Sequence, residues 1–171
     1  VSQTLLPMLG VETAIGRSFL PEEDVTPGAH PVVMLGYGFW QRAFAGNPEI
    51  VGKTIRLTGR SFTVVGVTSE GFHGLTGAGF STDFFVPLMM FGTVAGESNN
   101  PLLENRLNRR YLVVGRIDEG VTPEGVRAGL EVLASRIQED NPDIDQEWIF
   151  STLPLQDGAL DPEFDGAVKP F

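Results

Sequence analysis

Few residues of this chain are of the types that carry chemistry. There is no cysteine, which excludes thiol catalysis, disulfide bonds and cysteine-ligated zinc. The two histidines, His30 and His73, lie in different segments, and no motif joins them. A serine nucleophile needs a base and a sharp strand-to-helix turn, and no Gly-x-Ser-x-Gly sequence occurs. The histidines and serines therefore predict no catalytic site.

Acidic side chains gather in two clusters in the last third of the sequence. The clusters are Glu139, Asp140, Asp143 and Asp145, and then Asp157, Asp161, Glu163 and Asp165. A calcium loop needs oxygen ligands at alternating positions around a central glycine. In the first cluster Pro142 interrupts the series and the glycine is missing. We interpret both clusters as solvated surface, with a calcium loop or a hydrolase built on the dispersed carboxylates as the alternatives.

Three further segments could bind ions. Arg106, Arg109 and Arg110 form a basic cluster that could hold an anion, but we favour pairing with the surplus carboxylates. The glycine-rich segment 70–82 has neither the lysine nor the following helix of a phosphate cradle, so we expect a mobile loop. At the acidic residues 22–24 we expect a solvated turn rather than a cation site. The sequence thus assigns no catalytic, cofactor-binding or metal-binding residue, and no cofactor.

Charge and hydropathy limit the class of protein. The formal net charge is −10, which disfavours binding to nucleic acid and to anionic lipid. Hydrophobic residues make up 42% of the 171 residues, enough for a packed core. No apolar run approaches the roughly 20 residues that span a bilayer, and no signal peptide is visible. Because the sequence starts without Met, we expect it to be a piece of a longer protein.

The first hundred residues read as short strands and helices separated by turns. Residues 31–35 form an apolar run typical of a buried strand. Aromatic residues four apart, such as Trp40 and Phe44, predict a helix over 37–45 that ends at Gly46. Alternation over 54–67 predicts a hairpin, with Gly59 and Arg60 at its turn and a positive φ at Gly59. The remaining expectations are a short helix over 2–9, a strand over 83–90 and an irregular connection over 91–108.

The last third predicts a strand–helix–strand unit. Strands are expected over 111–117 and 148–155. Between them Thr122 fits a helix N-cap, Pro123 the first helical position and Glu124 the positive end of the helix dipole. The helix ends at Asn141 and Pro142. Its apolar face is formed by Val126, Leu130, Leu133 and Ile137.

These elements predict an α+β fold with two lobes. The smaller, β-rich lobe spans about residues 10–98 and includes a short helix. The strand–helix–strand lobe spans about 109–156, and residues 1–9 could complete it. Residues 1–171 then form one domain.

A series of glycine, proline and aromatic landmarks gives the chain a family resemblance. The landmarks are Leu9-Gly10-Val11, Gly16-Arg17-Ser18-Phe19, Glu22-Glu23-Asp24, Gly36-Tyr37-Gly38-Phe39-Trp40-Gln41-Arg42 with Phe44, Gly46-Asn47-Pro48, Val51-Gly52-Lys53-Thr54-Ile55-Arg56-Leu57, Gly59-Arg60, Val64-Val65-Gly66-Val67, Gly71-Phe72, Val86-Pro87-Leu88, Val114-Gly115-Arg116-Ile117 and Glu119-Gly120-Val121-Thr122. In order and spacing, over most of residues 1–160, they resemble the MacB-like periplasmic core domain of ABC-transporter permeases. The match is best to the group of duplicated orphan permeases, and it says nothing of the substrate.

This resemblance implies an extracytoplasmic, non-catalytic domain of a bacterial inner-membrane permease. It implies a porter-like lobe beside a β-rich lobe, and a role in coupling or in contact with a partner or substrate. The implied partners are the membrane helices, a second copy of the permease, a cytoplasmic ATPase and a periplasmic adaptor or substrate. The family usually carries an earlier strand and helix, so the first lobe is expected to lack a part and the isolated chain to associate through an unpaired sheet edge.

Two other hypotheses remain open at this point. A stand-alone secreted binding module would hold its ligand at the glycine-rich loop. A hydrolase would need a pocket in which two carboxyl groups converge.

Overall fold

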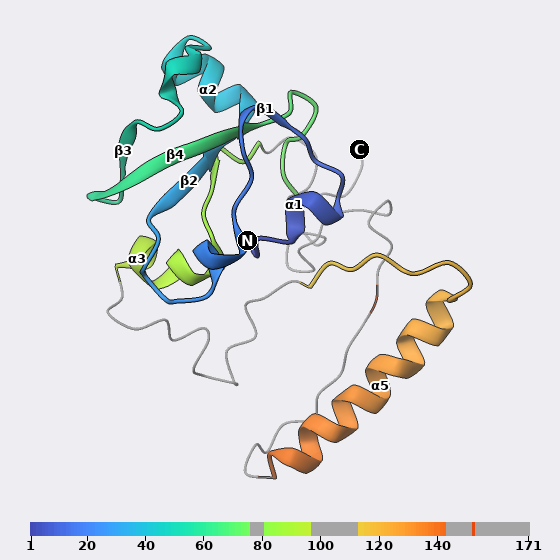
Figure 1. The fold of residues 1–171 in the computed structure, drawn as a ribbon. Helices are drawn as coiled ribbons and strands as arrows, with labels where there is room; N and C mark the ends of the chain where they lie inside the picture. The colour runs from blue at the N-terminus through green and yellow to red at the C-terminus, as the bar shows by residue number, and fades with distance from the viewer. Residues whose placement is uncertain (76–80, 97–112, 143–151, 153–171) are drawn as a thin grey trace, which may run out of the picture. The chain divides into compact units, whose positions relative to one another are not determined.

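The computed structural model describes residues 1–75, 81–96, 113–142 and 152. The chain divides into two compact units. Described residues up to 96 belong to the first unit, and residues 113–142 and 152 belong to the second. The elements confirm the α+β class (Figure 1), whereas the lobe limits given above stay a prediction.

The first unit is built around one long strand. Strand β4 (Arg60–Thr68) pairs with β3 (Thr54–Leu57) and β1 (Thr13–Gly16) in antiparallel fashion, and with β2 (Val32–Leu35) in parallel. Strand β5 (Phe84–Phe85) adds to the other edge of β2. Figure 1 shows β4 between β2 and β3. The register with β2 shifts at Val65, where β4 carries one extra residue, as in a β-bulge.

Both faces of this sheet are covered. On one face Val33, Leu35, Phe62 and Val64 are fully buried in a cluster that also contains Trp40 and Met90. On the other face Met34 and Val65 pack with Leu6 and Phe19. Burial on both faces explains why β2 is a continuous apolar run, because neither side of the strand meets water.

Short helices supply the covering layers. Among the residues described in this unit they are α1 (Leu5–Met8), α2 (Tyr37–Phe44), α3 (Phe91–Ala95) and three 3-10 turns, η1 (Pro21–Asp24), η2 (Pro48–Ile50) and η3 (Leu88–Met90). Helix α2 confirms the aromatic spacing, since Trp40 is buried in the core. It ends where Ala45 and then Gly46 take positive φ angles of 51° and 66°. The glycine stop is confirmed, although the left-handed turn begins one residue earlier, at Ala45.

Three predictions for this unit were wrong in detail. The hairpin turn is Thr58–Gly59 rather than Gly59–Arg60, because Arg60 already pairs with Leu57. Both turn residues have positive φ, 49° and 83°, as a type I′ turn requires. Only Phe84–Phe85 of the strand expected over 83–90 pairs with β2, since Pro87 has no N–H to continue the ladder. The first residues of the irregular connection form helix α3.

The described part of the second unit is dominated by helix α5 (Pro123–Asp140). Thr122 is its N-cap, and its hydroxyl accepts a hydrogen bond from the N–H of Gly125 at 3.1 Å. At the other end the amide of Asn141 donates to the carbonyl of Ile137. Both predicted ends are confirmed. The predicted apolar face is shifted, because Leu133 is 46% exposed and Ala134 is buried.

The strand expected over 111–117 is wrong for its described part. Residues 113–117 are not in a strand, and Val113 is 92% exposed. Alternation of apolar residues specifies a strand only when a neighbour is available to pair with it. The second expected strand, 148–155, lies outside the described residues apart from Thr152, which is in no strand. Within the described parts of both units, no helix is long and apolar enough to cross a membrane.

Candidate functional site

The residues first considered for chemistry do not form a catalytic or metal centre in the described structure. Among residues 1–75, 81–96, 113–142 and 152, no group of three or more His, Cys, Asp and Glu side chains is placed to hold a metal ion. His73 contributes its carbonyl, which accepts a hydrogen bond from the N–H of Thr82 at 2.8 Å. Glu139 and Asp140 lie at the exposed end of α5.

Several candidates fall outside the described residues. They are Gly77 and Gly79 of the glycine-rich segment, Arg106, Arg109 and Arg110, Asp143 and Asp145, and Asp157, Asp161, Glu163 and Asp165.

The acidic segment 22–24 holds parts of the chain together, so the expected solvated turn is confirmed for the exposed Glu22 but was wrong for Glu23. Glu23 is only 6% exposed. Its two carboxylate oxygens accept hydrogen bonds from the guanidinium of Arg17 at 2.9 and 2.7 Å, and one also accepts from the N–H of Leu20 at 2.8 Å. A carboxylate can be buried in this way because three donors and one cation replace its water.

These contacts also shift the protonation equilibria of the pair. The hydrogen bond from Arg17 lowers the pKa of Glu23, and the N–H of Leu20 lowers it further against the opposing effect of burial. The hydrogen bond to Glu23 raises the pKa of Arg17. Both shifts favour the charged pair.

Asp24 connects segments that are distant in the sequence. Its carboxylate accepts from the N–H of Gln3 at 2.9 Å and from the N–H of Met89 at 3.2 Å. Through Asp24 the N-terminal segment, η1 and η3 are held together. One sequence signal was available for Glu23: it follows Leu20 by three residues with Pro21 between them, a spacing typical of a carboxylate that closes a first helical turn.

At two glycines of the first unit, the backbone of another segment comes into close contact with the glycine. A Cβ at Gly66 would collide with the carbonyl oxygen of Arg17, and one at Gly36 with the carbonyl oxygen of Thr82. Gly36 also donates its N–H to Asp83 at 2.8 Å. The landmark glycines Gly36 and Gly66 are therefore needed for close backbone contact.

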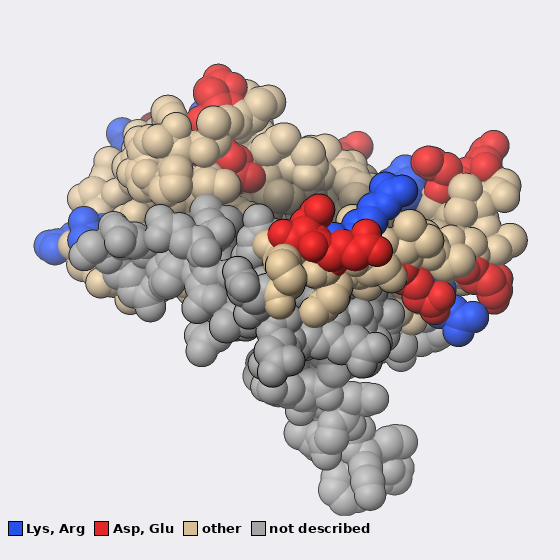
Figure 2. Space-filling view, turned by 90° about the horizontal axis from the view of Figure 1, so that it is seen from below, with Lys and Arg blue, Asp and Glu red and all other residues tan. Residues whose placement is uncertain are grey.

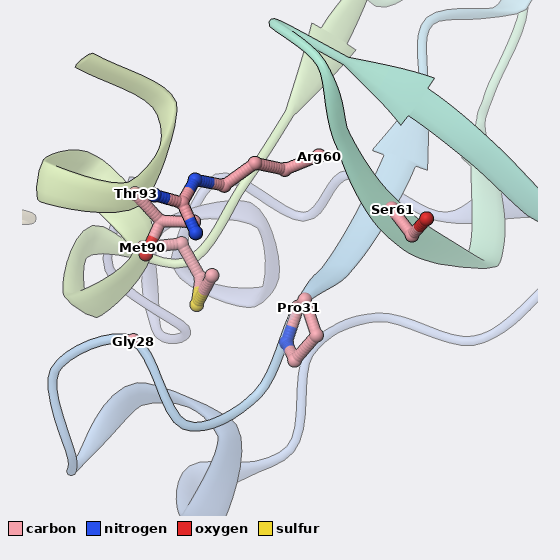
Figure 3. A pocket seen from close by; sticks show the side chains of 6 residues that line it. All are labelled: Gly28, Pro31, Arg60, Ser61, Met90 and Thr93. Carbon is pink, nitrogen blue, oxygen red and sulfur yellow. The ribbon is translucent and has the colours of Figure 1, made fainter. Parts of the chain in front are cut away.

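A shallow pocket of about 340 Å³ opens at the start of β4. Its lining residues are Gly28, Pro31, Arg60, Ser61, Met90 and Thr93. Figure 3 shows the guanidinium of Arg60 reaching across to Met90 and Thr93, with Pro31 on the opposite side. This site was missed in the sequence, because its residues come from three separate segments.

The fold and these contacts define an α+β domain whose buried polar groups hold its own segments together. The chain belongs to the family of MacB-like periplasmic core domains, whose profile matches residues 1–133. Family membership gives the chain an extracytoplasmic position and confirms the resemblance read from the landmarks.

Two solved structures are similar to the chain, and the first of them supports this fold. The periplasmic region of MacB from Actinobacillus actinomycetemcomitans is similar with a TM-score of 0.52 and 17% identity, over 81% of this chain and 55% of that one. A domain of a putative permease protein from Porphyromonas gingivalis aligns with a TM-score of 0.49 and 17% identity, over 89% of this chain and 66% of that one. The chain thus spans about half of the MacB region. No curated protein sequence matches it.

Proposed function

We propose that this domain is a non-catalytic, load-transmitting part of an ABC-transporter permease. It would act outside the membrane, in contact with the membrane helices and with a second copy of the same permease. Cytoplasmic ATP hydrolysis would move the domain, and the domain would pass that movement to a periplasmic adaptor or a substrate. Membership of the family of MacB-like periplasmic core domains supports the placement of the domain in a permease, outside the membrane.

The hydrogen bonds accepted by Glu23 and Asp24 are the observation that supports the mechanical role. A domain that transmits movement must resist bending between its segments. Here two neighbouring carboxylates hold backbone N–H groups of Gln3, Leu20 and Met89. Such partly buried, charge-assisted hydrogen bonds resist local opening more than exposed ion pairs do.

Spin labels in the whole permease test this proposal. The chain contains no cysteine, so Glu12→Cys, at an exposed position, gives one label in each copy of the domain. With the permease and its ATPase in lipid, we expect the distance between the two labels to change when ATP is added. An unchanged distance distribution during turnover would contradict the coupling role.

A further inference from the structure

The alternation of β4 directs Arg60 toward the pocket. Phe62 and Val64 are fully buried on the face that packs with Met90. Since side chains two apart share a face of a strand, Arg60 continues this row beyond the end of the core. Its guanidinium comes to lie beside Met90 and Thr93 (Figure 3). No described residue forms an ion pair with it, the described ion pairs being those of Arg17 and Arg42.

The main chain of Ser61 also faces this pocket. Two residues further on, the N–H of Thr63 donates to the carbonyl of Pro31 at 2.8 Å, so Thr63 faces β2. Because main-chain groups alternate along a strand, Ser61 faces the same edge. Strand β2 begins only at Val32, opposite Thr63, so no described strand pairs with this edge at Ser61. An open stretch of strand edge is thus placed beside an unpaired cation.

The remaining lining is suited to an extended chain. The exposed Pro31 provides apolar surface, and the side chain of Thr93 provides a hydroxyl. The volume of about 340 Å³ is at the lower end of the range for ligand sites, which is room for one or two side chains.

We propose that this pocket binds an acidic, extended segment of a partner polypeptide. A carboxylate of the segment pairs with the guanidinium of Arg60, its main chain hydrogen-bonds to Ser61, and an apolar neighbour lies on Pro31. This is strand addition at a sheet edge combined with charge recognition. The inference rests on the proposed function, because it names the kind of partner that the domain engages.

Charge complementarity selects an acidic occupant. Arg60 is the one charged residue among those that line the pocket, and no acidic residue lines it, in a chain whose net charge is −10. Figure 2 shows blue atoms at the left edge, the side on which Figure 1 places the β3–β4 hairpin. An acidic protein repels an acidic peptide over most of its surface. Binding of such a peptide would therefore indicate a specific site on the chain.

A labelled peptide of alternating Glu and Val, capped at both ends, tests the proposal by fluorescence anisotropy with the 171-residue chain. We expect binding to the native chain, and the Kd to rise by about tenfold or more in Arg60→Gln, since one charged pair at a binding site is worth that much. Thr93→Val is expected to weaken binding less.

Arg56→Gln is the matched control. Arg56 lies in the same hairpin opposite Ser61, so its side chain stands on the other face of the sheet from Arg60. This variant removes the same charge and is expected to keep the Kd within about twofold, well under 1 kcal/mol. Equal losses in Arg56→Gln and Arg60→Gln would overturn the proposal. Equal binding of a peptide with Gln in place of Glu, equal binding of capped single glutamate, or no binding by the native chain would overturn it too.

The spin-label experiment separates this inference from the proposed function. A permease carrying Arg60→Gln is expected to retain the ATP-dependent change in distance between copies. Absence of peptide binding by the native chain, with that change in distance intact, rejects only the partner site, whereas an unchanged distance with intact peptide binding rejects only the coupling role.

Discussion

At the scale of the residue, Glu23 connects the sequence to the architecture most directly. Its carboxylate is buried, and it closes the turn from Leu20 while holding Arg17. The Arg17 side chain is 43% exposed, so water partly screens the pair. The hydrogen bonds of the buried oxygens therefore matter more than the charge attraction alone.

Glu23→Gln is expected to lower the free energy of unfolding by about 1–3 kcal/mol, the usual cost when a buried group loses a charged partner. The amide oxygen can still accept from Leu20, but the amide group opposes the Arg17 donors. Urea unfolding of the chain measures the change. Glu22→Gln is the control, because Glu22 is exposed and should alter stability by less than about 0.5 kcal/mol. Equal effects of the two variants would show that burial of Glu23 contributes nothing.

The same pair predicts a dependence on pH. The pKa of Glu23 is lowered in the folded state, chiefly by Arg17, so the folded state favours the ionised carboxylate. Its contribution is present above the unfolded pKa of about 4.3 and is lost as the pH falls through the lower folded value. We expect the difference in unfolding free energy between the native chain and Glu23→Gln to shrink below about pH 4.5. A difference that stays constant from pH 7 to 3 would contradict this assignment.

The sequence could indicate an acidic turn at 22–24 but not its burial. Asp24 binds Gln3 and Met89, which are 21 and 65 residues away in the chain. Local composition predicts only whether a carboxylate is near turn residues. The donors that allow its burial come from other segments, which only the folded chain brings together.

At the scale of the element, the strand β4 depends on close backbone approach. Gly66→Ala places a Cβ against the main chain of Arg17, which cannot move without disturbing β1. We expect a loss of about 1–3 kcal/mol in unfolding free energy, as for other overpacked sites. Gly71→Ala is the control, since a Cβ there meets nothing within 4 Å. Thermal unfolding that shows equal melting temperatures for the two variants would reject the role given to Gly66.

Helix α5 shows how much of an element can be predicted from local chemistry. Thr122, Pro123 and Asn141 were sufficient to predict both of its ends, because capping depends on neighbouring backbone groups. Which face is buried depends on what packs against the helix, and the periodic pattern selected Leu133 where the structure buries Ala134. For the same reason the expected strand at 113–117 could not be established from alternation.

Removing the cap of α5 gives a test at this scale. Thr122→Ala deletes the acceptor of the Gly125 N–H and is expected to cost about 1 kcal/mol of helix stability. Circular dichroism at 222 nm during a thermal ramp follows the loss. Ser135→Ala, within the helix, is the control and should leave the signal unchanged or slightly increased, because alanine favours helix. A loss no greater than in the control would show that the Thr122 cap does not stabilise α5.

At the scale of the whole molecule, the landmarks that appear in the sequence are positions of packing and close approach. Trp40 fills the core, and Gly36 and Gly66 allow main chains to meet. The family could be identified from these landmarks because packing and close backbone contact at such positions each require a particular residue type. The pocket at Arg60 could not be identified from the sequence, since Gly28, Arg60 and Thr93 become neighbours only in the folded chain.

The central claim is that the first unit transmits movement without deforming. It is tested by placing two spin labels in one copy of the domain, at Glu12→Cys and Glu49→Cys, with the permease and its ATPase in lipid. Both positions are exposed, and they flank the sheet at β1 and η2. We predict that the distance distribution between them stays the same with and without ATP, while the distance between copies changes. A shift or broadening of the distance within one copy during turnover would contradict the account.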